Sequence, residues 1–332
     1  MLRHDLTTDS WVLLAPSRAM RPRDTAVPPA GPPGAAGAAT RCPFCPGNEE
    51  ETPPEVFALR DESGWRVRVV PNRYPAIEGS GEPAAAVGAE PFLSFPGIGA
   101  HEVIVESPHH DRELYEQPAA HVAEVLRVLQ SRQQIHETDE RIQAVTVFRN
   151  QGRAAGASLS HPHWQLLSAP VVPPHLARRD GVAQRYFTAH GRPLLADLVD
   201  AERRASERIV EESEEWVALV PFGARFPYET WLVPKRPAAS LLDLDAVSID
   251  ALSVLLPRTL SRYRAVLGKF DYNVVSITAP GCARRERHFG YHLQVLPRLA
   301  SPAGFELGSG MWINSKLPED AARELRNARA AS

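Results

Sequence analysis

The sequence predicts an α+β fold made of two similar halves, each an antiparallel sheet with helices packed on one side. Short runs with period-two alternation or β-branched residues are typical of strands, and they flank segments whose apolar residues recur at helical spacing. The order of these runs in the first half returns in the second half. Such ordered parallels indicate an internal duplication, with the halves related by a pseudo-twofold axis.

The first half contains four predicted strands and one predicted helix. The strands are residues 65–72 (WRVRVVPN), 101–108 (HEVIVESP), 144–150 (AVTVFRN) and 163–170 (HWQLLSAP). The helix is predicted over residues 118–137, where apolar residues lie at helical spacing. Residues 26–40 (AVPPAGPPGAAGAAT) are a low-complexity run of proline, glycine and alanine, which predicts a mobile loop.

The second half repeats this order of elements. Its predicted strands are residues 216–223 (WVALVPFG), 228–235 (YETWLVPK), 272–278 (YNVVSIT) and 291–298 (YHLQVLPR), and its helix covers 248–268. We expect the halves to be residues 1–175 and 176–332. The block GYHLQ aligns with HPHWQ of the first half, keeping His292 and Gln294 but lacking the first histidine. The first half is therefore predicted to hold the working site and the second half a degenerate copy.

Composition excludes several classes of partner. The 332 residues carry a net charge of −3, which gives no broad basic surface for nucleic acid or anionic membranes. No apolar run approaches the roughly 18 residues that span a bilayer, and the first residues contain no continuous apolar segment typical of a signal peptide. We expect a cytoplasmic protein whose phosphate ligands are small and bound locally.

Two of the three cysteines are close together. Cys42 and Cys45 lie in RCPFCPGNEE, and Cys282 stands alone. In a chain without a signal peptide, this spacing favours a metal site or a redox site over a structural disulfide. We interpret Cys282 as an inert thiol.

The stretch GASLSHPHWQLLSAP places His161, His163 and Gln165 at two-residue spacing. Side chains alternate faces along a strand, so these three are predicted to form a row on one face. Such a row can bind a metal, bind a phosphate or act as a nucleophile.

The glutamine in this row favours transfer over hydrolysis. A neutral imidazole, with an unperturbed pKa near ~6.5, is a competent nucleophile towards phosphorus. The amide of Gln165 can donate a hydrogen bond to phosphate oxygens but has no useful proton to exchange with a leaving group or a water.

The segment FRNQGRAAGASLSHPHWQ, with the CxxC pair and the duplicated halves, resembles the galactose-1-phosphate uridylyltransferase family, the transferase branch of the histidine-triad superfamily. The resemblance extends over nearly the whole chain and includes DSWVLLAPSRAMRP, CPFCPGNE, HEVIVESPHH and PYETWLVPK. It implies two histidine-triad-like halves. It also implies nucleotidyl transfer from a nucleoside diphosphate sugar to a sugar 1-phosphate or phosphate, through a covalent nucleotidyl-histidine.

The resemblance assigns roles to individual residues. It implies that His163 is the nucleophile, that Gln165 holds the phosphoryl oxygens, and that the carbonyl of His161 fixes the tautomer of His163. The substrate-binding residues that it implies are Asn72 in the nucleotide pocket, Asn150 and Ser158 on the phosphates, and Arg18 and Arg21, which reach the sugar phosphate of the neighbouring subunit in a homodimer.

The resemblance also implies a structural Zn²⁺ site. Its ligands are Cys42, Cys45, His110 and His161, a chemically sensible Cys₂His₂ set, with His109 as the alternative to His110. A second, iron-type site found in some members is incomplete, because Gly290 stands where its first clustered histidine would be.

The resemblance leaves the substrate open between two branches. The first interpretation is a UDP-glucose:hexose-1-phosphate uridylyltransferase. However, Ser309 and Gly310 stand where such enzymes have an aromatic and an acidic residue for the hexose hydroxyls. The alternative is an ADP-glucose phosphorylase that transfers AMP to phosphate, which GASLSHPHWQ, APVVPPHL and GFELGSGMWIN resemble more. A dinucleotide phosphorylase or hydrolase, and a zinc-dependent nucleotide-binding protein without activity, remain further alternatives.

Overall fold

The computed structural model describes residues 1–20, 42–79, 91, 92, 94, 96–281 and 286–328. The predicted loop at 26–40, Arg21 and Cys282 lie outside these residues. In the described part of the chain, no helix is both long enough and apolar enough to cross a lipid bilayer.

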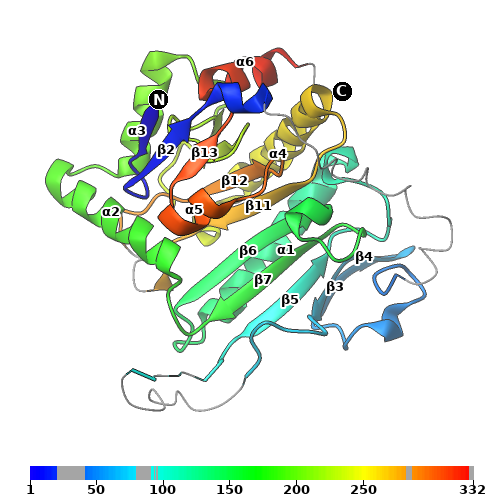
Figure 1. Ribbon diagram of the computed structural model, residues 1–332. Coiled ribbons are helices and arrows are strands. Elements are labelled where there is room, and N and C mark those ends of the chain that lie inside the picture. The colour runs from blue at the N-terminus through cyan, green and yellow to red at the C-terminus, as the bar shows by residue number, and fades with distance from the viewer. Residues whose placement is uncertain (21–41, 80–90, 93, 95, 282–285, 329–332) are drawn as a thin grey trace.

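A ten-stranded antiparallel sheet forms the centre of the molecule (Figure 1). Its strand order is β3–β4–β5–β7–β6–β11–β12–β10–β9–β8. The strands of the first half are β3 (Phe57–Asp61), β4 (Gly64–Pro71), β5 (Ala100–Val105), β6 (Ala144–Gln151) and β7 (His163–Ala169). Those of the second half are β8 (Ile209–Glu212), β9 (Trp216–Leu219), β10 (Thr230–Pro234), β11 (Tyr272–Ile277) and β12 (His292–Pro297).

The strands of the two halves follow the same order outwards from the β6–β11 pair at the middle of the sheet. Reading outwards from this pair gives β6, β7, β5, β4, β3 on one side and β11, β12, β10, β9, β8 on the other. Each half therefore has the same antiparallel topology, and the register at the junction sets Asn150 opposite Asn273. The predicted α+β class with two similar halves is confirmed. The halves share one continuous sheet.

Two long helices cover one face of this sheet. α1 (Ala119–Glu137) belongs to the first half and α4 (Ala246–Leu267) to the second, and the two pack against each other. Leu126 and Leu129 of α1 and Leu252 and Leu256 of α4 join one core with sheet residues that include Trp164. Burial of these apolar stripes is the main stabilising contribution to the duplicated core.

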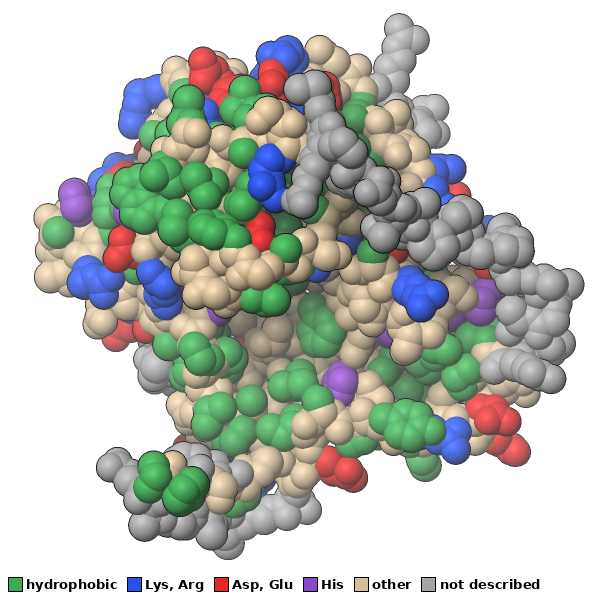
Figure 2. All heavy atoms as spheres, in the orientation of Figure 1, with side chains coloured by type: hydrophobic (Ala, Val, Ile, Leu, Met, Phe, Trp, Pro, Cys, Tyr) green, Lys and Arg blue, Asp and Glu red, His purple; other side chains and the backbone are tan. Residues whose placement is uncertain are grey.

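A second layer lies over part of the opposite face. β1 (Leu2–Asp5) and β2 (Ser10–Leu14) form a hairpin, and β13 (Trp312–Asn314) pairs in parallel with β2. The other helices are α2 (Pro174–His190), α3 (Leu194–Ala205), α5 (Gly304–Ser309) and α6 (Pro318–Asn327), of which α6 packs against α4 and β8. Apolar side chains gather on the surface over this part of the molecule (Figure 2). Leu2, Leu6 and Trp11 of the N-terminal segment are exposed to solvent.

Candidate active site and metal cluster

The HPHWQ segment joins the sheet at its second histidine. β7 begins at His163, so His161 precedes the strand, and the predicted row on one strand face holds only for His163 and Gln165. Pro162 has no N–H with which to continue the ladder to β5, which explains the late start of the strand. Trp164 points to the other face and packs in the main core, as the alternation predicts.

A backbone hydrogen bond fixes the ring of His163. Nδ1 of His163 lies 2.8 Å from the carbonyl oxygen of His161. A carbonyl can only accept, so Nδ1 carries the hydrogen and Nε2 keeps its lone pair. The side chain is buried, and this burial, with a smaller contribution from the charge of Arg149, lowers the pKa of His163. The ring is therefore a neutral imidazole with Nε2 available for attack at neutral pH.

Four of the predicted ligands form a compact cluster. One ligand atom from each of Cys42, Cys45, His110 and His161 lies within 4.8 Å of the other three. Nδ1 of His161 is 3.7 Å from Sγ of Cys42 and 3.6 Å from Sγ of Cys45, and Nδ1 of His110 is 3.3 Å from Sγ of Cys45. This group could hold a metal ion, and it contains His110 where the sequence left His109 as an alternative.

The histidines of this cluster are held in the orientation that a metal ligand needs. Nε2 of His161 donates to the carbonyl oxygen of Ser107 at 2.8 Å, and Nε2 of His110 is 2.9 Å from Oγ of Ser160. Burial lowers the pKa of His161 to about 4, so its Nδ1 faces the thiols without a proton. Such outer partners are typical of metal-binding histidines.

The CxxC loop also contacts His163. Phe44, between the two cysteines, is buried, and its ring centroid lies 5.3 Å from that of His163 and 6.1 Å from that of His161. Since the carbonyl of His161 also holds His163, two separate contacts connect the cysteine cluster to the candidate nucleophile. Ordering of the cluster therefore bears directly on the position of His163.

His101 brings Gln165 and Asn72 together. Its Nε2 is 2.8 Å from Oε1 of Gln165 and 3.3 Å from Nδ2 of Asn72, and its carbonyl oxygen accepts from the backbone N–H of Asn72 at 2.7 Å. The sequence analysis did not identify His101 as a site residue. Its contact with Gln165 depends on the register of β5 with β7, which sets Val103 opposite Gln165, and no local sequence pattern indicates that register.

The second half supports the loop between β6 and β7. Nδ2 of Asn273 donates to Oδ1 of Asn150 at 2.8 Å and to the carbonyl oxygen of Ala155 at 2.9 Å. Oδ2 of Asp271 accepts from the N–H of Ala154 at 2.7 Å. Gly152, with φ +83°, passes so close to this carboxylate that a Cβ there would lie 2.0 Å from Oδ1. The loop thus depends on contacts across the β6–β11 junction.

The remaining predicted substrate residues are less constrained. Ser158 is exposed in the loop between β6 and β7. Arg18 is exposed in the 3-10 turn η1 (Pro16–Met20), and within the described part of the chain no hydrogen bond or ion pair involves its side chain. The structure therefore brings together His163, Gln165 and Asn72, but not Arg18.

A buried ion pair that sequence reasoning did not identify lies close to His163. Arg149 of β6 donates from Nε and Nη2 to the two carboxylate oxygens of Glu106, at 3.0 Å and 2.9 Å. Its Nη1 donates to the hydroxyl of Tyr272 at 2.6 Å. Both charged side chains are fully buried, and Glu106 raises the pKa of Arg149 against the opposing effect of burial. Arg149 and Glu106 are far apart in the sequence, so no local sequence pattern predicts that they pair.

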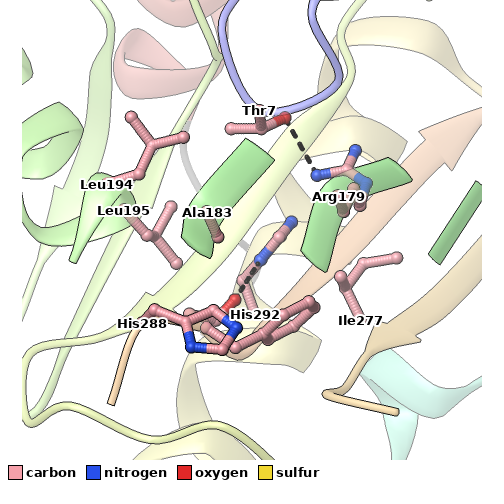
Figure 3. Close-up of a pocket in the computed structure, with 10 residues that line it drawn as sticks. Thr7, Arg179, Ala183, Leu194, Leu195, Ile277, His288 and His292 are labelled. Atoms are coloured by element: carbon pink, nitrogen blue, oxygen red, sulfur yellow. Dashed lines mark hydrogen bonds between the residues drawn. The ribbon is translucent and has the colours of Figure 1, made fainter. Parts of the chain in front are cut away.

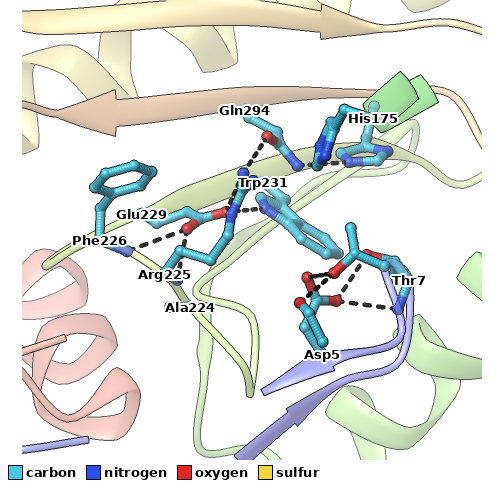
Figure 4. Close-up of polar contacts among 12 residues, drawn as sticks. Asp5, Thr7, His175, Ala224, Arg225, Phe226, Glu229, Trp231 and Gln294 are labelled. Carbon is cyan, nitrogen blue, oxygen red and sulfur yellow. Dashed lines mark hydrogen bonds and ion pairs between the residues drawn. The ribbon is translucent and has the colours of Figure 1, made fainter. Parts of the chain in front are cut away.

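The second half repeats the backbone contact that holds the histidine of the candidate site, but there the glutamine also contacts the histidine. Nδ1 of His292 is 3.1 Å from the carbonyl oxygen of Gly290 (Figure 3), a contact that corresponds to the one between His163 and the carbonyl of His161. The amide nitrogen of Gln294 is 3.1 Å from Nε2 of His292, and Oε1 accepts from Arg225 at 3.0 Å (Figure 4). Every polar atom of this histidine is therefore engaged within the protein.

The incomplete second metal site is explained by packing. A Cβ at Gly290 would lie 2.5 Å from Cβ of Leu195, so a histidine does not fit there without movement of α3. His292 and Gln294 are 2% and 1% exposed. The buried arrangement around His292 stabilises the second half and holds its Nε2 against the amide nitrogen of Gln294, although the ring lines a small pocket (Figure 3).

Two family models match the chain. Residues 1–173 match the N-terminal domain of galactose-1-phosphate uridyl transferase, and residues 179–327 match its C-terminal domain. The ADP-glucose phosphorylase of Arabidopsis thaliana is 34% identical over 331 residues, which cover 98% of this chain and 92% of the relative. The galactose-1-phosphate uridylyltransferase of Haemophilus influenzae is 31% identical over 332 residues, which cover 98% of this chain and 93% of the relative.

A solved structure agrees closely with the whole chain. The crystal structure of an ADP-glucose phosphorylase from Arabidopsis thaliana with bound ADP-glucose matches with a TM-score of 0.85 and 31% identity, covering 100% of this chain and 99% of that chain.

Proposed function

The chain belongs to the galactose-1-phosphate uridyl transferase family, and from this membership we propose that it transfers a nucleoside monophosphate from a nucleoside diphosphate sugar to a sugar 1-phosphate or to phosphate. The observation that carries the proposal is the hydrogen bond from Nδ1 of His163 to the carbonyl of His161, which leaves Nε2 as the free nucleophile.

The proposed reaction has two displacements at one phosphorus. Nε2 of His163 bonds to the α-phosphorus while the bond from that phosphorus to the bridging oxygen breaks, and the sugar 1-phosphate leaves with that oxygen. An oxygen of the acceptor then bonds to the same phosphorus, and the electron pair of the P–N bond returns to Nε2. Charge accumulates on the non-bridging oxygens, where the amide NH₂ of Gln165 is the proposed donor.

Further residues of this chain are proposed to bind the substrates. Asn150 and Ser158 lie in or beside the loop that leads to His163, and we assign them to the phosphates. Asn72, in contact with His101, is assigned to the nucleotide. Arg18 and Arg21 are assigned to the sugar phosphate bound by a second subunit.

We assign structural Zn²⁺ to the cluster of Cys42, Cys45, His110 and His161. Two thiols and two imidazoles are the ligand set that zinc prefers in closed tetrahedral sites. Burial, followed by the neighbouring thiol of Cys42, raises the pKa of Cys45 to about 11. A bound dication reverses this effect by stabilising the thiolate, so the four residues fit the ion. The proposed role of the metal is to order the residues that hold His163.

A specific observation favours the adenylyl-transferring phosphorylase over the uridylyltransferase as the substrate branch. Ser309 ends α5, and its hydroxyl donates to the carbonyl of Phe305 at 2.6 Å, while Gly310 has φ +68° and no side chain. These positions offer neither an aromatic ring nor a carboxylate to a hexose. The 34% identity to the ADP-glucose phosphorylase of Arabidopsis thaliana points to the same branch.

The intact mass of the protein tests both the chemistry and the branch. Wild type and His163→Ala are incubated briefly with UDP-glucose or ADP-glucose, without an acceptor. An AMP adduct on wild type alone supports the phosphorylase branch, and a UMP adduct on wild type alone supports the uridylyltransferase branch. An adduct that persists in His163→Ala contradicts the role of His163, and no adduct with either donor contradicts the proposed function.

A cytoplasmic homodimer is proposed as the working form. The paired thiols of Cys42 and Cys45 suit a reducing compartment. The exposed apolar side chains of Leu2, Leu6 and Trp11, on the hairpin that leads to Arg18, suit burial against a second subunit.

A further inference from the structure

His101 contacts two parts of the candidate site at once. It lies on β5 two residues before Val103, which pairs with Gln165 of β7, so His101 and Gln165 are diagonal neighbours on one sheet face. Nδ1 of His101 accepts from the backbone N–H of Ala76 at 3.2 Å, and its Nε2 is 2.8 Å from Oε1 of Gln165.

These two contacts fix the hydrogen of the His101 ring. A backbone N–H can only donate, so Nδ1 is the unprotonated nitrogen and the neutral ring carries its hydrogen on Nε2. That N–H donates to Oε1 of Gln165. With this tautomer the NH₂ of Asn72, whose oxygen accepts from the N–H of Tyr74, lies 3.3 Å from Nε2 as a neighbour and not as a donor to it. The amide of Gln165 is thereby prevented from turning over, because the opposite orientation would place its NH₂ against another donor. Among the described residues, nothing accepts a hydrogen bond from that NH₂, so it is left for a ligand.

The second half shows the consequence of a different arrangement. Residue 229 corresponds to His101, because it lies two residues before Trp231, which pairs with Gln294. Glu229 there contacts Arg225, and Arg225 donates to Oε1 of Gln294. In both halves the glutamine oxygen is held by a donor. In the second half, however, the NH₂ closes on His292, whereas in the first half it remains free of His163.

We propose that His101 is a positioning residue that orients the amide of Gln165 towards the phosphoryl group. It also couples this orientation to the loop 72–76, which contains the proposed nucleotide-binding residue Asn72. The inference rests on the proposed function of Gln165. The coupling follows from the contacts at the two ends of the loop 72–76, because the backbone N–H groups of Asn72 and Ala76 both donate to His101. A nucleotide that orders this loop therefore also orders the ring that donates to Gln165.

Two substitutions separate the two contacts. His101→Gln places an amide NH₂ near the position of Nε2 and keeps a donor to Gln165, while His101→Asn keeps an acceptor near Nδ1 for Ala76 and loses that donor. We expect nucleotidyl-enzyme formation in a single turnover to slow about tenfold or more in His101→Asn and His101→Ala, and less than about threefold in His101→Gln.

A double-mutant cycle with Gln165→Ala distinguishes positioning from a general structural role. In the Gln165→Ala background, His101→Asn should have little further effect on the rate, because there is no amide left to orient. An equal loss in both backgrounds, or an equal loss in His101→Asn and His101→Gln, overturns the proposal.

The orientation of Gln165 can also be measured without turnover. In protein labelled with ¹⁵N-glutamine, the side-chain amide signal of Gln165 is assigned by its loss in Gln165→Ala. We expect this signal to shift and broaden in His101→Asn and to stay sharp in His101→Gln. An unchanged signal in His101→Asn overturns the proposal, and this result holds even if wild type forms no adduct, which would contradict the proposed function separately.

Discussion

Gln165 has one hydrogen-bonding atom on each side of its amide, and among the described residues only the oxygen has a partner. Its oxygen accepts from His101, and its nitrogen is the proposed donor to the phosphoryl oxygens. Gln165→Glu keeps the first interaction but replaces the NH₂ donor by a carboxylate oxygen. We expect the rate of nucleotidyl-enzyme formation to fall about 10²–10³-fold, because a preorganised donor is lost and a like charge is added beside the phosphate.

This substitution should leave the fold intact, since the hydrogen bond to His101 remains. Thermal unfolding close to that of wild type is the control, and Gln165→Asn provides a matched variant with the same amide on a shorter side chain. A Gln165→Glu enzyme that forms the adduct at the wild-type rate would show that this amide does not contact the phosphate.

The loop between β6 and β7 depends on β11 of the other half. Asn273→Asp replaces the donor to Asn150 by an acceptor, so the amide of Asn150 must turn over or move. We expect the single-turnover rate to fall about tenfold with a small change in melting temperature. The control is Val275→Thr, two residues further along the same strand. Equal losses in both variants would point to a general disturbance of β11.

The CxxC segment is the element whose order is proposed to depend on a metal. Cys45→Ser should abolish binding of one equivalent of zinc per chain, measured by elemental analysis, and lower the melting temperature by roughly 10 °C. Adduct formation should slow as well, because Phe44 and the carbonyl of His161 both contact His163. Cys282→Ser removes the third cysteine and serves as the control. Full zinc content in Cys45→Ser would contradict the assignment.

The strands of the duplicated core could be predicted because each carries its own local pattern. The segment 144–150 alternates clearly and forms β6 at Ala144–Gln151, and the helix predicted at 118–137 is α1 at Ala119–Glu137. The predicted strand 216–223 ends early, at Leu219, because Pro221 follows and cannot donate to a ladder.

The second layer could not be predicted in the same way. β1, β2 and β13 are short, and β13 pairs with a strand about 300 residues earlier in the chain, so no local period marks them. The contact of His101 with Gln165 likewise depends on the register of β5 with β7 and on a backbone N–H from a distant loop. For the metal cluster, the spacing of Cys42 and Cys45 favoured a metal site or a redox site, and only the resemblance to the family added His110 and His161 as the other ligands.

Stability of the whole chain should decline in mild acid because His292 is buried without charge. Burial is the largest cause, followed by the charge of Arg179, and together they lower the pKa of His292 to about 3. The unfolded chain takes up this proton near pH ~6.5 and the folded chain does not, so stability is lost as the pH falls from there towards 3.

We expect this histidine to contribute about 1.4 kcal/mol of destabilisation per pH unit within that window. Denaturant unfolding of wild type and His292→Gln between pH 7 and pH 5 measures the difference. The variant should be less stable at pH 7 but should lose less stability on acidification. Parallel curves for the two proteins would show that His292 gains a proton in the folded state.

The proposed homodimer makes a further prediction, because Arg18 and His163 would act together only across subunits. Arg18 is exposed, and its side chain makes no hydrogen bond or ion pair with any described residue of its own chain, so each active site would need residues from both subunits. The double variant Arg18→Ala, Arg21→Ala and the variant His163→Ala should therefore both be inactive alone. Co-expressed with different tags, they form mixed dimers in which one of the two sites has all three residues.

Random assortment makes half of the dimers mixed, so roughly a quarter of all sites should regain activity, and dimers purified through both tags should regain about half. The measurement is adduct formation per chain in the doubly purified protein. Activity that fails to return, in dimers shown by mass to contain both chains, would place Arg18 and Arg21 in the site of their own subunit or outside it. Recovery near half would establish that the second subunit completes the site.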